Sequence, residues 1–180
     1  MWWERLRRFE RTEMDYAGAA YFVESPSFLE HASPRRVQFV VIHITGGNHL
    51  SSAVNEFLST SHTKSAHYIV DRDGTIVQMV REANTAAHCA NLRTAHNQMS
   101  IGIEHVCSSH SQITDVQYQR SAQLVKSLCT RHNIPIEHNT TPLAPGIRGH
   151  TEEFRSSTHT GCPNSVWNWD SYINLVNNAV

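Results

Sequence analysis

Three residues that could hold a metal ion stand beside glycine or proline, where the backbone can turn a side chain into a cleft. His43 follows the apolar run FVVI and precedes Thr45 and a Gly-Gly pair, His150 follows a glycine, and Cys162 lies between a glycine and a proline. Zinc hydrolases use three protein ligands of these types and leave a fourth position for water. The chain has 13 histidines and four cysteines, so spacing alone allows many triples. The H-E-x-x-H helix motif is absent, which disfavours an ordinary zincin.

A carboxylate interrupts the apolar stretch SIGIEHV at residues 100–106. Burying an unpaired carboxylate is costly, so we expect Glu104 to face a cleft or a partner. A structural salt bridge is the alternative to a functional role. Burial would raise the pKa of Glu104 and a nearby cation would lower it, so both directions remain open at this point.

The strands that must position these residues follow from the apolar pattern. Residues 39–44 are apolar or β-branched except for His43, and this short run predicts a strand buried on both faces, with His43 near its end. Residues 67–80 contain two β-branched runs around an Asp-Gly pair, which predicts a hairpin. Residues 100–106 predict a further buried strand. The polar stretch 81–99 is too long to serve only as a connection.

Helices are predicted where apolar residues recur at helical spacing. The segments are 50–60, 114–133 and 166–180, and Thr114 with Gln117 fits a capping box at the start of the second. Strands and helices together predict a single α/β domain with a central mixed β-sheet flanked by helices. We assign this domain to residues 37–180.

Residues 1–36 are predicted to form an N-terminal extension that packs on the domain. Trp2, Leu6 and Phe9 recur at roughly helical spacing, with arginines between them. This pattern favours a helix docked on the domain, and a helix at a membrane surface is the alternative.

The composition of the 180-residue chain excludes several classes of partner. The formal net charge is −1, so bulk electrostatics gives no indication of nucleic acid binding. No apolar stretch approaches the ~20 residues of a membrane-spanning helix. The first residues lack the apolar core of a secretory signal, so we expect synthesis in the cytoplasm. The four cysteines form no C-x-x-C pair and are expected to be free thiols.

Five segments carry a resemblance to a known family. They are VVIHITGG, SAHYIVDRDGTIVQMV, NQMSIGIEH, IRGH and TGCPNSVWNWDSYI, and they lie in this order between residues 37 and 173. Together the segments resemble the type 2 N-acetylmuramoyl-L-alanine amidases, whose fold is shared with phage lysozyme-type amidases and peptidoglycan-recognition proteins. The resemblance implies a zinc cleft at one edge of the sheet.

The resemblance also implies roles for individual residues. His43, His150 and Cys162 match the three ligands of Zn²⁺, and their charges would leave the ion one net positive charge. Glu104 matches the family's acidic residue, which would accept a proton from water and pass it to the leaving amine. His88 aligns with a family histidine, although its neighbours differ, and is expected to contact substrate at the cleft rim.

The chain departs from the family pattern before the third ligand. Many members have a lysine two residues earlier, where this chain has Thr160 preceded by His159. We expect one of these two residues to assist catalysis, and Thr160 would offer a neutral hydrogen bond to an oxyanion. Cys162 stands twelve positions after His150, a longer interval than the family suggests.

The function implied by the resemblance is hydrolysis of the amide between the lactyl group of muramic acid and L-alanine. The substrate would be peptidoglycan, reached after release or delivery of the protein, or muropeptides in the cytoplasm. A recognition module that binds peptidoglycan without cutting it is one alternative. A cysteine amidase that uses Cys162 or Cys89 with a histidine is another, and chelation against thiol alkylation would separate it from the zinc enzyme.

Overall fold

The computed structural model describes residues 14–108, 111–156, 160–163 and 166–180. Its strands are β1 (Tyr21–Phe22), β2 (Phe28–Leu29), β3 (Phe39–Ile44), β4 (Tyr68–Val70), β5 (Ile76–Gln78), β6 (Thr85–Ala86), β7 (Ser100–His105) and β8 (Gly146–Gly149). Six of them form a sheet in the order β1-β5-β4-β7-β3-β8, and β2 pairs with β6 in a small antiparallel sheet. The β4–β5 pair is antiparallel and the other pairs of the main sheet are parallel. The predicted mixed sheet is therefore confirmed.

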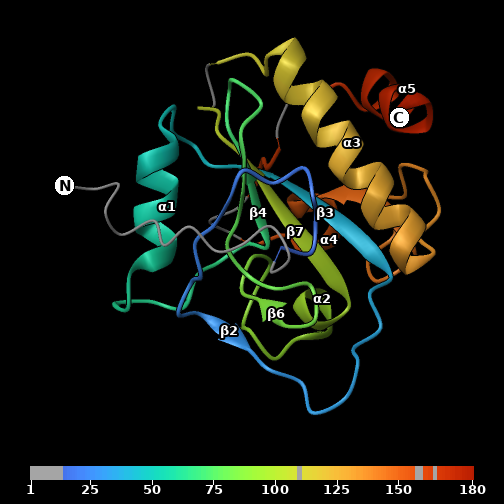
Figure 1. The fold of residues 1–180 in the computed structure, drawn as a ribbon. Helices are drawn as coiled ribbons and strands as arrows, with labels where there is room; N and C mark the ends of the chain where they lie inside the picture. The colour runs from blue at the N-terminus through green and yellow to red at the C-terminus, as the bar shows by residue number, and fades with distance from the viewer. Residues whose placement is uncertain (1–13, 109–110, 157–159, 164–165) are drawn as a thin grey trace.

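Helices cover both faces of the main sheet. They are α1 (Leu50–Leu58), α2 (Ala95–Gln98), α3 (Asp115–His132), α4 (His150–Glu153) and α5 (Trp169–Asn178). Helices α3 and α5 lie together on one side of the sheet and α1 lies on the other (Figure 1). The result is an α/β domain of three layers, in which two separate apolar clusters fill the spaces between sheet and helices.

Strand β3 shows why a short apolar run can sit at the centre of such a sheet. Side chains alternate between the two faces of a strand. Val40 and Ile42 pack in the cluster that contains residues of α3 and α5, whereas Phe39 and Val41 pack with Cys89 on the opposite face. All four side chains are fully buried, as predicted for a strand covered on both faces.

The predicted hairpin is present, because β4 and β5 pair from Val70 and Ile76 outward. Gly74 adopts a φ of 84° in the connecting turn, which favours glycine, and its N–H donates to the Asp71 carbonyl at 3.0 Å. The four cysteines are buried free thiols, also as predicted.

Helix α3 begins with only half of the predicted capping box. The Thr114 side chain accepts a hydrogen bond from the Gln117 N–H at 3.1 Å. The Gln117 side chain does not return this bond, because its amide donates to the carbonyls of Val70 and Val106 at 2.9 and 3.2 Å. Contacts to the last residue of β4 and to the residue after β7 thus take the place of the second half of the cap and tie α3 to the sheet.

The described part of the N-terminal segment joins both sheets. Strand β1 extends the main sheet beside β5, and β2 pairs with β6. The residues of the predicted N-terminal helix, Trp2, Leu6 and Phe9, lie outside the described part of the chain. The division of the chain at residue 36 stays a prediction.

A buried carboxylate connects α3 to β4. Glu82 accepts hydrogen bonds from the Tyr68 hydroxyl and from the Arg131 guanidinium, each at 2.5 Å, and its other oxygen lies 2.8 Å from Nε2 of His132. Burial acts to raise the pKa of Glu82, but these partners outweigh it and the pKa is lowered. The ion cluster thus favours the charged carboxylate in the folded chain.

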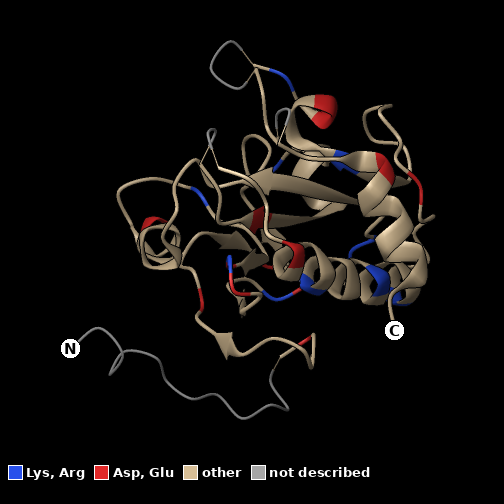
Figure 2. Ribbon diagram, turned by 90° about the horizontal axis from the view of Figure 1, so that it is seen from above, with Lys and Arg blue, Asp and Glu red and all other residues tan. Residues whose placement is uncertain are grey.

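Charged residues of both signs are distributed over the described chain, with basic and acidic residues interspersed along the ribbon (Figure 2). Within the described ranges, no helix combines the length and the apolar character needed to cross a bilayer.

Candidate active site

Parallel strands β3 and β7 place His43 and Glu104 side by side. The two residues are direct partners in the β3–β7 register. Because partners in register point to the same face of a sheet, both side chains leave the sheet on the face opposite Ile42 and Ile103, which lie in the α3 core. Both stand near the carboxyl ends of their strands, the end at which open α/β sheets commonly bind ligands.

His150 reaches the same place from the neighbouring strand. It is the first residue of α4 and follows β8, the edge strand that pairs with β3. The N–H of Gly149 donates to the Glu152 carboxylate at 2.7 Å, which fixes the turn between strand and helix. The ring centroids of His43 and His150 are 4.7 Å apart.

Cys162 is held against α4 by backbone contacts. The N–H and the hydroxyl of Thr151 both donate to the Cys162 carbonyl, at 2.9 and 3.1 Å. A side chain on Gly149 would meet this segment, since a Cβ there would lie 2.5 Å from Pro163. The glycine before His150 therefore allows the loop that carries Cys162 to approach.

The structure brings the ligand-type atoms of His43, His150 and Cys162 within 4.8 Å of one another. The three residues are 2, 6 and 8% exposed. The Cys162 Sγ lies 3.9 Å from Nδ1 of His43. Around a tetrahedral zinc ion, with bonds of ~2.1 Å to nitrogen and ~2.3 Å to sulfur, the two atoms would be roughly 3.6 Å apart. The nitrogen, nitrogen and sulfur donors and their separations thus fit a zinc ion.

The Glu104 carboxyl lines the same cleft. Its Oε2 atom is buried and has no hydrogen-bond partner among the described residues. Burial raises the pKa of Glu104 to about 8. Glu104 forms no salt bridge with any described residue, so the salt-bridge alternative finds no partner there. An orphaned carboxylate oxygen beside three metal-type ligands is a further feature that suits a bound cation and its water.

The Cys162 thiol also responds to burial. Burial, followed by the charge of Glu104, raises the pKa of Cys162 to about 12, and a hydrogen bond from the Ile44 N–H at 3.4 Å opposes the shift. A bound cation acts strongly in the opposite direction, because a coordinating thiol loses its proton. The thiol is therefore better suited to bind a metal than to act alone as a nucleophile.

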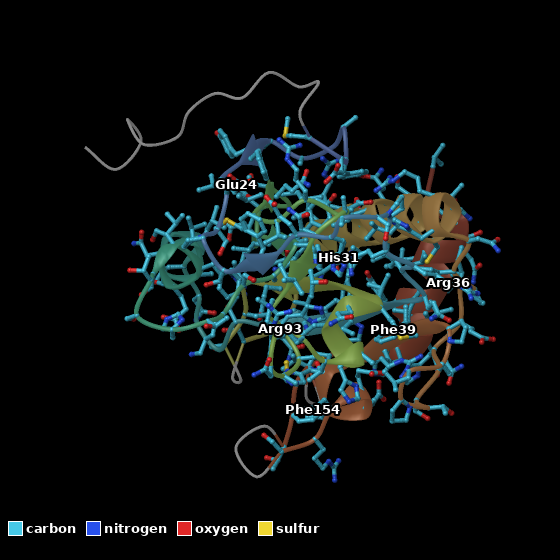
Figure 3. All side chains as sticks on the ribbon, turned by 90° about the horizontal axis from the view of Figure 1, so that it is seen from below. Glu24, His31, Arg36, Phe39, Arg93 and Phe154 are labelled. Carbon is cyan, nitrogen blue, oxygen red and sulfur yellow. The ribbon has the colours of Figure 1, made fainter. Side chains whose placement is uncertain are left out.

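The cleft around these residues has a volume of about 800 Å³. One wall is formed by α1 and the segment after it, where Lys64 pairs with Glu56 at 2.9 Å. Phe154 follows α4 and lines the cleft as well (Figure 3). Thr160 is exposed and lines the cleft, whereas His159 lies outside the described residues. Thr160 is accordingly placed to meet a ligand in the cleft.

His88 lines the cleft, and both of its ring nitrogens contact protein groups. Nδ1 lies 3.0 Å from Nε2 of His43, and Nε2 lies 3.0 Å from the Ser100 hydroxyl. Burial is the main cause that lowers the pKa of His88 well below its usual value. The ligand-type atoms of His88, His43 and Cys89 also lie within 4.8 Å of one another. That second group shares His43 with the first.

Comparison with known proteins gives the family. The family model described as N-acetylmuramoyl-L-alanine amidase matches residues 33–165, which is most of the chain. The chain belongs to the N-acetylmuramoyl-L-alanine amidase family. Among its relatives, N-acetylmuramoyl-L-alanine amidase A of Achromobacter lyticus is 29% identical over 177 residues, covering 91% of this chain and 96% of the relative.

Solved structures of other proteins share the fold. A selenomethionine derivative of AmpD superimposes with a TM-score of 0.73 at 24% identity, covering 89% of this chain and 96% of that one. PlyL superimposes with a TM-score of 0.64 at 20% identity, covering 86% and 93%. The fold predicted from the resemblance is therefore confirmed.

One feature of this family member was not predicted from the sequence. Arg148, on β8, is fully buried and its guanidinium donates to Glu153 at 2.7 Å. The other Glu153 oxygen lies 2.5 Å from Nδ1 of His96 in α2. This ion cluster anchors the helix that begins with His150. A charged residue inside the apolar run GIRG, two positions before a ligand, was the available sequence signal.

Proposed function

We propose that this N-acetylmuramoyl-L-alanine amidase is zinc-dependent and cleaves the amide between the lactyl group of muramic acid and L-alanine. The observation that carries the zinc assignment is the meeting of His43, His150 and Cys162 beside a carboxyl oxygen of Glu104 that has no partner in the part of the chain that the structure describes. The A. lyticus relative carries the name of the same activity. The substrate class is peptidoglycan or muropeptides released from it.

His43, His150 and Cys162 would hold the zinc ion. When bound, zinc polarises a carbonyl and acidifies water, which is the chemistry that amide hydrolysis needs. The protein contributes a rigid and mostly buried set of ligands, since the three side chains are each less than a tenth exposed. Rigid ligands reduce the reorganisation required during the reaction.

Glu104 would act as the general base and then as the general acid. Its carboxylate accepts a proton from the attacking water and passes it to the nitrogen of the leaving amine. A buried carboxylate whose Oε2 has no competing partner among the described residues is available for both transfers. Thr160 would donate a neutral hydrogen bond to the developing oxyanion, and His159 is the alternative donor in this segment.

The cleft would bind the glycan on one side of the scissile bond and the stem peptide on the other. Half-exposed polar side chains on α1 and after it, including Glu56 and Lys64, provide hydrogen-bonding groups for a polar ligand. We expect the enzyme to act on the cell wall or on muropeptides derived from it.

Mass spectrometry of peptidoglycan digests tests the proposal. Treatment with the protein should release stem peptides that begin with a free L-alanine, and a chelator should abolish the release until zinc is restored. Binding to peptidoglycan without any cleavage would instead identify a recognition module. Cleavage that survives chelation but not thiol alkylation would identify a cysteine amidase.

A further inference from the structure

A series of hydrogen-bonded side chains extends from Nε2 of His43. Nδ1 of His43 faces Cys162 Sγ at 3.9 Å, while its Nε2 lies 3.0 Å from Nδ1 of His88. Nε2 of His88 lies 3.0 Å from Oγ of Ser100. The Ser100 hydroxyl in turn lies 2.6 Å from the backbone carbonyl oxygen of His96. Three consecutive hydrogen bonds thus connect His43 to α2.

The direction of each bond follows from the carbonyl at the end of the chain. A carbonyl oxygen can only accept, so the single proton of the Ser100 hydroxyl points to His96. The Ser100 oxygen therefore accepts from Nε2–H of His88. A neutral imidazole carries one N–H, so Nδ1 of His88 must accept, and Nε2–H of His43 donates to it. Nδ1 of His43 is then the nitrogen that carries no proton.

The backbone holds the His88 ring in this position. Gly102 lies below the ring on β7, and a Cβ there would be 2.3 Å from Cγ of His88. The Asn97 side chain accepts from the N–H groups of His88 and Cys89 at 3.2 and 2.9 Å. The Asn97 side chain also donates to the carbonyl of Ala90 at 3.1 Å, so it holds three consecutive residues of this loop. The ring is thus supported from the sheet and from the loop.

We propose that His88 and Ser100 are positioning residues that fix the tautomer of His43, so that Nδ1 is its metal-binding nitrogen. The proposal rests on the proposed zinc function. Metal-binding histidines usually direct their other N–H to an acceptor, and loss of that acceptor typically weakens metal binding about 10–100-fold. His88 therefore acts through His43, which differs from the substrate contact predicted from the sequence.

The variant Ser100→Ala tests the relay because it removes an acceptor and leaves every proposed ligand in place. Ser121→Ala is its matched control, since Ser121 is also fully buried and its hydroxyl lies 2.7 Å from Nε2 of a histidine, His105. Zinc affinity of the full chain is measured by competition with a chelator at fixed pH. We expect Ser100→Ala to bind zinc about tenfold more weakly than wild type, and Ser121→Ala to match wild type.

A second readout needs neither metal nor activity. Nitrogen-15 NMR of the imidazole rings in zinc-free protein reports which nitrogen carries the proton. Wild-type His43 should show a protonated Nε2 and an unprotonated Nδ1. The Ser100→Ala and His88→Ala variants should show His43 as a mixture of both tautomers, and Ser121→Ala should not.

The outcomes separate the relay from the zinc function. Wild-type affinity and wild-type tautomer signals in both Ser100→Ala and His88→Ala would overturn the relay while leaving the zinc enzyme intact. Zinc loss in His88→Ala with unchanged Ser100→Ala would also overturn it, because His88 would then be a ligand. A wild-type protein that binds no zinc would refute the proposed function instead. If Ser100→Ala does not fold, the tautomer signals of His88→Ala decide the question.

Discussion

Replacing Glu104 with glutamine should remove catalysis without removing the metal. The substitution nearly preserves the shape of the side chain, and Oε2 has no hydrogen-bond partner among the described residues that an amide would displace. General acid–base groups typically contribute 10²–10⁴-fold to rate. We therefore expect Glu104→Gln to lower kcat by about 10²–10⁴-fold while its zinc affinity stays within a few-fold of wild type.

The same substitution has an opposite effect on stability in zinc-free protein. Burial raises the pKa of Glu104 from 4.5 to about 8 in the folded chain. The folded state therefore holds this proton more tightly than the unfolded state, and stability is lost as pH rises from 4.5 towards 8. Glu104→Gln removes that loss. After allowance for partial exposure of the side chain, we expect the free energy of unfolding of the zinc-free variant at pH 8 to exceed that of wild type by on the order of 1–3 kcal/mol.

The assay combines turnover of purified muropeptide, zinc content, and urea unfolding of chelator-treated protein at pH 5 and pH 8. Glu137→Gln, at an exposed position outside the cleft, serves as the control and should behave as wild type in each measurement. Wild-type turnover in Glu104→Gln would remove Glu104 from the mechanism. Loss of zinc from that variant would show instead that the carboxylate helps to hold the metal.

Four further substitutions give independent checks. Cys162→Ser should lower zinc affinity at least tenfold, whereas Cys89→Ser should retain zinc. Elemental analysis after dialysis against a weak chelator measures the zinc retained by each variant. The reverse result would show that the group of His43, His88 and Cys89 holds the ion. Arg148→Met leaves the buried Glu153 carboxylate without its guanidinium partner and should lower the free energy of unfolding by about 3–5 kcal/mol, measured by chemical denaturation. A decrease below about 1 kcal/mol would contradict this expectation. Because the pKa of Glu82 is lowered, its contribution to stability is present at neutral pH and is lost as pH falls through that pKa. Glu82→Gln should therefore be less stable than wild type at pH 7. In thermal unfolding, its stability should also decrease less than that of wild type between pH 7 and pH 3.

Much of the fold could be predicted because its elements have strong local patterns. The run that became β3 was placed correctly, since six consecutive residues without charge have few alternatives to a covered strand. The β4–β5 hairpin followed from the Asp-Gly turn. The start of α5 was placed three residues early, because the side chain of Asn168 caps the helix and accepts from the Ser171 N–H at 3.0 Å. The partners of Gln117 were not predictable, since the two carbonyls lie 47 and 11 residues before it and come near its side chain only in the folded sheet.

The ligand set could be proposed from the sequence only through the resemblance to a family. Residue type and a neighbouring glycine or proline marked His43, His150 and Cys162, but thirteen histidines gave many equal combinations. The roles proposed for Thr160, His159 and Glu104 remain predictions for the experiments above. Ser100 and Asn97 could not have been selected, because nothing in a single serine or asparagine indicates which histidine it will support.

The sequence by itself indicated the central strands β3, β4, β5 and β7, the helices α1, α3 and α5, and the residue types available for metal chemistry. These properties depend on side-chain periodicity and turn chemistry over a few neighbouring residues. Only the tertiary structure decided that residues 43, 150 and 162 meet, and that Nε2 of His43 faces Nδ1 of His88. Those facts depend on the register of β3, β7 and β8 and on hydrogen bonds between residues up to 119 positions apart, which no local pattern encodes.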